Sequence, residues 1–276
     1  MPVAGVAAES GALAMDPADG EPAFVYTDPG LGLRYAKWNG TAWDLQTIDA
    51  NGSAGILVFG PVSQASVVYR ASGAALGYAV FDGNTWQTQT VSPGPLLHSG
   101  FDLAYDVLGH PAISFIRDGG LYLIRWDGVL WQEETLEDQI PLLPPTSLVF
   151  EVEGNPVVAF RESNDPDFAV WVARFVGNQW EKTLVDSGTI GTGASIHMLR
   201  NLDDSLQIAY SLYKGLPSLG AARFNGTDWE TEVIDASISG AHLGMAMRND
   251  GRVGIAYRRG NDLVVLAERD LFTPTP

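Results

Sequence analysis

Three arginines recur at one position of a repeated pattern, and clustered arginines can bind anions. Arg70, Arg161 and Arg258 each directly follow an aromatic residue that ends an apolar run. A guanidinium group can hold a carboxylate or a sulfate through two parallel hydrogen bonds. We therefore predict that these side chains share an anion-binding pocket. The alternative is that each arginine pairs with carboxylates of its own acidic chain.

A second set of polar residues lies near the starts of apolar runs. Asp102, His197 and His242 could together hold a divalent metal with open coordination positions, and Glu162 adds a carboxylate beside Arg161. The spacing does not require a metal, and a water-filled polar lining is the alternative. We therefore predict no cofactor, and we count Asp102, Glu162 and His242 with the arginines as candidate ligand-binding residues. No Ser-His-Asp order, P-loop or His-Glu-x-x-His motif is present, so we predict no catalytic residue.

The elements that must position these residues form a repeat. Tryptophans that follow a tight turn are spaced 43, 45, 49 and 49 residues apart, at Trp43, Trp86, Trp131, Trp180 and Trp229. The second repeat contains four strand-like runs, over residues 55–60, 65–70, 75–81 and 85–91, which we call strands a to d. A period of about 40–50 residues made of short strands is typical of propeller blades.

The number of blades follows from strand b, which ends in an aromatic residue six times, at Tyr26, Tyr69, Phe115, Phe160, Tyr210 and Tyr257. The sixth repeat stops after three strands. We predict that residues 2–7 supply its fourth strand and remove an open sheet edge. The fold class is therefore an all-β, six-bladed propeller in one domain over residues 1–270, with a linker-like Thr/Pro tail over 271–276.

The turns and loops differ between the two faces of such a blade. Asn-Gly or Asp-Gly joins strands c and d in four repeats, which predicts a hairpin turn with both central residues at positive φ. The longest loops, over residues 139–146, 161–167 and 213–217, lie on the opposite face. We expect the ligand on that loop-rich face, because variable loops on a rigid scaffold usually carry function. We expect the turn-following tryptophans to be structural and to cover the neighbouring blade.

Composition excludes several classes of partner. The formal net charge of the 276-residue chain is −17, which opposes nucleic acid and anionic membranes as partners. No apolar run is long enough to span a membrane, so we predict no membrane insertion. The chain has no cysteine, so it has no disulfides and no thiolate metal sites.

The turn between strands c and d resembles two known families. Gly83-Asn84-Thr85-Trp86 matches the second half of the Asp-box of sialidase-type propellers, although Phe81 stands where an Asp-box has its aspartate. The Asp-Gly-x-x-Trp turn is also similar to the repeats of six-bladed fucose-binding lectins. Those lectins seat sugar between blades with an arginine on one strand and a glutamate on the next. Ser66 to Tyr69 and Leu76 to Tyr78 carry neither residue. The resemblance implies a shared fold and favours a function that involves glycans.

We predict a secreted or surface-displayed binding module, a monomer, that holds a glycan or protein ligand of anionic character. The rival hypothesis is an enzyme, either a sialidase-like glycoside hydrolase or a polysaccharide lyase. A third is a structural repeat scaffold within a longer chain, to which the tail would be the tether.

Overall fold

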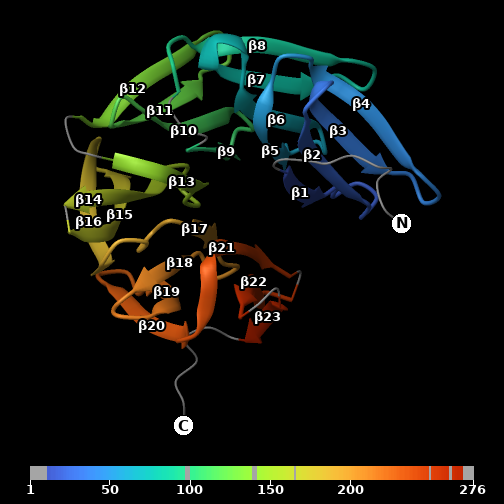
Figure 1. Ribbon diagram of the computed structural model, residues 1–276. Helices are drawn as coiled ribbons and strands as arrows, with labels where there is room; N and C mark the ends of the chain where they lie inside the picture. The colour runs from blue at the N-terminus through green and yellow to red at the C-terminus, as the bar shows by residue number, and fades with distance from the viewer. Residues whose placement is uncertain are drawn as a thin grey trace. The chain divides into compact units, whose positions relative to one another are not determined.

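The computed structural model describes residues 11–96, 100–138, 142–164, 166–248, 250–260 and 263–269. Over these residues the chain forms strands that pair with their neighbours in sequence, and the short 3-10 turn Ser72–Ala74 is the one helical element (Figure 1). None of the described residues belongs to a helix long and apolar enough to cross a membrane.

The strands form six antiparallel sheets, which we call blades 1 to 6 in chain order. Blade 1 consists of β1 (Gly11–Met15), β2 (Pro22–Asp28), β3 (Gly32–Trp38) and β4 (Trp43–Asp49). Blade 2 consists of β5 (Ser53–Phe59), β6 (Ala65–Arg70), β7 (Leu76–Phe81) and β8 (Trp86–Ser92). Blade 3 consists of β9 (Phe101–Tyr105), β10 (Pro111–Arg117), β11 (Gly120–Trp126) and β12 (Trp131–Glu137).

The second half of the chain repeats this order. Blade 4 consists of β13 (Leu142–Phe150), β14 (Pro156–Asn164), β15 (Asp167–Val176) and β16 (Gln179–Gly188). Blade 5 consists of β17 (Ile196–Arg200), β18 (Leu206–Tyr213), β19 (Pro217–Phe224) and β20 (Trp229–Asp235). Blade 6 has three described strands, β21 (Ile238–Met247), β22 (Val253–Arg259) and β23 (Leu263–Arg269). The six predicted blades are confirmed, whereas the strand predicted over residues 2–7 lies outside the described residues.

Contacts within the chain divide it into two units. Met1–Asp118 and Tyr122–Glu134 form the first, and Gly119–Leu121 and Thr135–Pro276 form the second. Blades 1 and 2 belong to the first unit and blades 4 to 6 to the second, while the division passes through blade 3. The predicted single domain stays a prediction.

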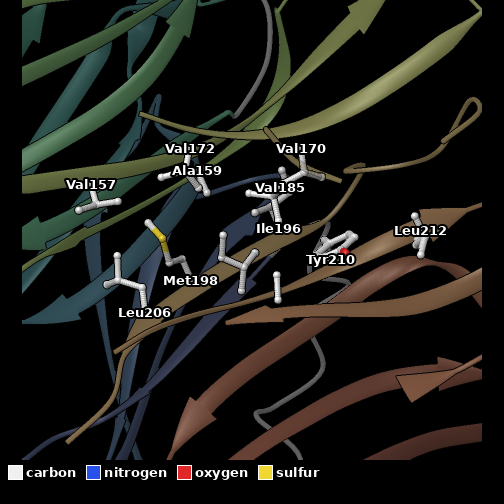
Figure 2. Packing of buried hydrophobic residues seen from close by; sticks show 12 residues of the cluster. Val157, Ala159, Val170, Val172, Val185, Ile196, Met198, Leu206, Tyr210 and Leu212 are labelled. Atoms are coloured by element: carbon white, nitrogen blue, oxygen red, sulfur yellow. The ribbon is translucent and has the colours of Figure 1, made fainter. Parts of the chain in front are cut away.

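The core lies between neighbouring blades, because strand alternation gives each sheet apolar residues on both faces. Ala159 and Val172 of blade 4 pack with Ile196 and Met198 of blade 5, and all four side chains are at most 7% exposed (Figure 2). In the first unit Val25 and Leu33 of blade 1 belong to one buried cluster with residues of blade 2. Each blade is therefore stabilised by its neighbours rather than by a core of its own.

Two of the turn-following tryptophans cover the neighbouring blade, as predicted. Trp86 of blade 2 packs edge-on against Tyr35 of blade 1 at 5.1 Å between ring centroids, and its Nε1 donates to Oε1 of Gln46 at 2.8 Å. Trp131 of blade 3 packs the same way on Tyr78 of blade 2 at 5.3 Å. The ring contacts, together with the hydrogen bond of the Trp86 N–H, fix the position of one blade on the next.

The aromatic residue that ends strand b also joins blades. All six of these rings are buried, with exposures of 6% or less. The hydroxyl of Tyr210 donates to Asp186 at the end of strand d in the preceding blade, at 2.8 Å. Tyr257 makes the same bond to Asp235 at 2.9 Å. A buried aromatic with a charge-assisted hydrogen bond thus links successive blades.

The turns between strands c and d differ from the prediction in one respect. Gly83 has a positive φ of 97°, but Asp82 does not, and the Asp82 carboxylate instead accepts hydrogen bonds from the backbone N–H groups of Asn84 and Thr85. The prediction of two positive φ values is therefore wrong for the Asp-Gly and Asn-Gly turns. The residue before glycine is needed for its side-chain acceptor. Blade 4 has the two-residue form, with Gly177 and Asn178 both at positive φ.

Two of the predicted loops are shorter than expected, because the strand ladders continue into them. In blade 4, β14 pairs with β15 out to Asn164 opposite Asp167, so most of the loop predicted over residues 161–167 is strand. The loop predicted over 139–146 is strand from Leu142 onward, with an irregularity between Leu143 and Thr146 where two prolines interrupt the pairing.

Candidate functional site

The three predicted arginines occupy equivalent positions at or near the ends of strands b. Arg161 is 8% exposed, its Cζ lies 4.3 Å from the centroid of the Phe168 ring, and burial lowers its pKa. Arg70 is half-buried at the end of β6, and Arg258 is exposed on β22. Arg70 belongs to the first unit and the other two to the second. A pocket shared by all three stays a prediction.

The other predicted residues have different surroundings from one another. Glu162 is 7% exposed on β14 and binds Nζ of Lys182 at 2.6 Å, so its charge is used within blade 4. Asp102 is half-buried on β9, and His242 is exposed on β21. His197 on β17 is half-buried, and burial lowers its pKa in spite of a hydrogen bond with the backbone of Leu243. The described residues contain no group of three or more His, Asp or Glu side chains arranged to hold a metal.

A different set of charged residues was missed by the sequence analysis. A basic residue stands directly before the aromatic that ends strand c in four blades, at Lys37, Arg125, Arg174 and Arg223. Each pairs with a carboxylate of its own blade. The constant offset from the Gly-x-x-Trp turn was the signal that could have found them. These side chains belong to the face with the short turns, opposite the loop-rich face.

Two of these arginines line a groove between blades 4 and 5, which we call groove A. Its volume is about 740 Å³, which suits a small ligand. Strand c of each blade and the turns after strands a and c form its walls. The lining residues are Glu151, Val152, Glu153, Asn155, Arg174, Val176, Asp203, Asp204, Ser205, Leu206, Arg223, Phe224, Asn225, Gly226 and Glu230.

The guanidinium of Arg174 is held by two residues in groove A. Nη2 of Arg174 donates to Oε1 of Glu151 at 2.5 Å and Nε donates to the same oxygen at 3.2 Å. Its Cζ lies 4.4 Å from the centroid of the Phe224 ring, which belongs to the neighbouring blade. The pairing and the ring fix the guanidinium plane, so its Nη1 group is a preorganised donor for a ligand.

The guanidinium of Arg223 is fixed in the same groove by blade 5. Nη2 of Arg223 donates to Oδ2 of Asp203 at 2.5 Å, and Nε donates to the hydroxyl of Ser205 at 3.2 Å. Hydrogen bonds from Ser205 and the charge of Arg223 lower the pKa of Asp203, so this carboxylate is ionised at neutral pH. Groove A thus offers donors and acceptors side by side, with apolar surface from Val152 and Phe224.

An equivalent groove lies between blades 1 and 2, and we call it groove B. Its volume is about 420 Å³. The lining residues are Asp16, Tyr35, Lys37, Asp44, Gln46, Phe59, Val62, Ser63, Gln64, Ala65, Phe81, Asp82 and Gly83. Groove B has one basic residue where groove A has two, and more aromatic surface.

The sequence matches no family model and no curated protein. Solved structures do match. A protein of unknown function from Dyadobacter fermentans is 14% identical, with a TM-score of 0.65 over 94% of this chain and 92% of that one. The Aleuria aurantia lectin AAL, in complex with Fucα1-6GlcNAc, is 14% identical, with a TM-score of 0.62 over 96% of each chain.

A polysaccharide lyase, an ulvan lyase bound to a GlcA–Rha3S saccharide, is 13% identical, with a TM-score of 0.61 over 93% of this chain and 80% of that one. Identities this low show the fold alone. The chain itself has a six-bladed β-propeller fold, and the sequence prediction of that fold is confirmed.

Proposed function

We propose that this chain is a glycan-binding module and that groove A is its binding site. The observation that carries the proposal is the fixed guanidinium of Arg174, held by Glu151 on its own blade and by the ring of Phe224 on the next. Sugar hydroxyls donate and accept at once, so neighbouring guanidinium and carboxylate groups suit them. The apolar face of a sugar ring packs on surfaces such as Val152 and Phe224.

The fold neighbours support the class of ligand. The Aleuria aurantia lectin binds a fucosylated disaccharide, and the ulvan lyase binds a sulfated saccharide. The fucose-binding lectins that the sequence resembles seat sugar between blades with an arginine and a glutamate, and groove A brings both residue types together between blades, although blade 2 carries neither at the matching strand positions. Groove A lies between blades and contains Arg174, Arg223 and Glu230. We therefore propose that the binding site lies on the short-turn face and not on the loop-rich face.

Charge indicates that the ligand of groove A is neutral. Five carboxylates line the groove, at Glu151, Glu153, Asp203, Asp204 and Glu230, against two guanidinium groups. An anionic sugar would be repelled by the excess negative charge. The anionic ligand expected from the sequence would instead belong with Arg161 and the other arginines of the loop-rich face.

The test is a substitution that removes the hydrogen-bond donors but keeps the packing. Arg174→Met retains an apolar stem over Phe224, and we expect it to weaken binding of a neutral glycan by about 10–100-fold, the effect of losing a hydrogen bond to a charged group. Arg125→Met is the matched control, because Arg125 pairs with Glu134 at 2.9 Å and lines neither groove. A glycan array identifies the ligand, and calorimetry measures the affinities.

Two results would contradict the proposal. One is a wild-type protein that binds no neutral glycan on the array. The other is equal weakening by Arg174→Met and Arg125→Met, which would mean that the arginines act only through general charge. Melting curves of both variants establish that each is folded before the affinities are compared.

An enzyme is the second candidate, favoured by the lyase neighbour. Lyase chemistry on a uronate needs a base and a group that neutralises the substrate carboxylate. In groove A both guanidinium groups already bind carboxylates, which makes them poor partners for a second anion. Incubation with a panel of polyanionic glycans, followed by ultraviolet absorbance for unsaturated products, tests this candidate directly. Turnover that survives Arg174→Met would place catalysis elsewhere on the chain.

We also propose that the protein acts as a monomer outside the cell or on its surface. The absence of cysteine and the net charge of −17 are compatible with that location. Light scattering during gel filtration measures the oligomeric state. Protease accessibility on intact source cells tests exposure at the surface, and a fully protected protein would exclude it.

A further inference from the structure

Groove B has the same place in its unit as groove A but a different chemistry. Its basic residue, Lys37, is already saturated. Nζ of Lys37 lies 2.8 Å from Oδ2 of Asp19 and also binds Oδ2 of Asp16, which is 5% exposed. Burial lowers the pKa of Lys37, but the hydrogen bonds to Asp16 and Asp19 outweigh it and raise the pKa. The charge of Lys37 is therefore neutralised by carboxylates of the protein itself and is not available to an anionic ligand.

The charge of groove B excludes an anionic ligand. Asp16, Asp44 and Asp82 line it together with Lys37, so the lining carries more negative than positive charge. Asp82 stays ionised, because backbone hydrogen bonds from Thr85 and Asn84 lower its pKa to about 2. An uncharged ligand meets no such repulsion.

The polar group that distinguishes groove B is the side-chain amide of Gln46. An indole N–H can only donate, so the bond from Nε1 of Trp86 at 2.8 Å fixes the amide oxygen of Gln46 toward the tryptophan. The NH₂ group of Gln46 is then a fixed donor, and no acceptor for it is found among the described residues. A half-buried donor of this kind gains from a ligand acceptor.

Aromatic and apolar side chains form a large part of the remaining walls of groove B. Phe59 and Phe81 are half-buried and Tyr35 is 4% exposed, while Val62 at the rim is 82% exposed. A second amide, Gln64, lies on the same side as Val62 in the turn after β5. A ligand that matches these walls has an apolar group for the aromatic rings and a carbonyl oxygen for the amide donor.

We propose that groove B is a second binding site and that it takes an uncharged sugar bearing an acetamido group. The carbonyl of the acetamide accepts from the NH₂ of Gln46, and the methyl group packs against Phe59 and Phe81. The choice of a sugar rests on the proposed glycan-binding function, whereas the acetamide rests on Gln46 and the aromatic walls alone. Groove B then differs from groove A in ligand, although the two occupy equivalent places between blades.

The test uses methyl N-acetyl-β-glucosaminide and methyl β-glucoside as probes. Gln46→Glu keeps an oxygen acceptor for Trp86 but replaces the donor by a carboxylate oxygen. We expect Gln46→Glu to weaken binding of the acetamido sugar at least tenfold. Gln89→Glu is the matched control, because Gln89 is the equivalent position of blade 2, is exposed and lines neither groove. We expect it to bind as the wild type does.

Each further result decides for or against the site. Wild-type protein that binds both probes equally, or neither, overturns the proposal. So does binding that is lost in Arg174→Met but kept in Gln46→Glu, because the sugar would then occupy groove A. Binding that persists in Arg174→Met and is lost in Gln46→Glu supports groove B whether or not groove A binds glycans.

A measurement on the wild type covers the case in which Gln46→Glu fails to fold. The side-chain NH₂ resonances of Gln46 should shift when the acetamido sugar is titrated, since the amide is the proposed donor. Resonances that stay unchanged at saturation overturn the proposal without any variant.

Discussion

Gly77 of blade 2 lies directly against the ring of Tyr69 on the adjacent strand. A methyl group at position 77 would lie 2.6 Å from Cζ and 2.7 Å from Cε1 of that ring. Carbon atoms in contact need about 3.5–4.0 Å. Tyr69 cannot move aside, because it is 2% exposed and its hydroxyl is hydrogen-bonded to Asp49. We expect Gly77→Ala to lower the free energy of unfolding by about 3 kcal/mol, at the upper end of overpacking effects.

Urea unfolding followed by tryptophan fluorescence measures this free energy. Gly244→Ala in β21 is the control, because a Cβ there would meet nothing within 4 Å, and we expect a change of at most about 1 kcal/mol, in the stabilising direction. In the double variant Gly77→Ala/Tyr69→Leu the smaller side chain makes room. Its destabilisation should be less than the sum of the single effects. A Gly77→Ala protein within about 0.5 kcal/mol of wild type refutes the reasoning.

Three further changes test the turns and the buried polar groups. Backbone hydrogen bonds lower the pKa of Asp82 from 3.8 to about 2, so the stability that it contributes is complete above pH 4 and is lost as the pH falls toward 2. The melting temperature of Asp82→Ala should therefore lie below that of wild type at neutral pH, and the difference should disappear as the pH falls through 2. Tyr210→Phe removes the bond to Asp186 and should lower the free energy of unfolding by about 2 kcal/mol in urea; no change would mean that the bond does not link blades 4 and 5. Lys182→Met removes the ion pair of the buried Glu162 and should lower the free energy of unfolding by about 3 kcal/mol, most of which Lys182→Met/Glu162→Gln should recover in the same assay.

The fold could be predicted because its determinants are local and repeated. The strand-b aromatics mark all six blades and the Gly-x-x-Trp turns mark five of them, and a period of this length has few structural solutions. The site could not be predicted in the same way. Arg161 was chosen because it follows the strand-b aromatic, where a variable loop was expected to begin, yet in the folded chain it is a strand residue that is almost fully buried. Arg174 belongs to a regular part of the repeat, and its ring partner Phe224 lies on another blade. Such a contact depends on how two blades pack, which spacing along the chain does not reveal.

The ion pairs and the grooves of the short-turn face differ in the number of repeats that form them. Arg174 and Glu151 come from one repeat, as do Arg223 and Asp203, whereas each groove needs walls from two repeats. A duplication or exchange of a whole repeat would therefore carry its ion pair intact and change only the opposite wall. New specificity can arise in such a chain by shuffling of repeats, with no intermediate that leaves a half-buried charge without its partner. Groove A and groove B differ in the way that such an exchange of repeats would produce, with an ion pair kept on one wall and a different opposite wall.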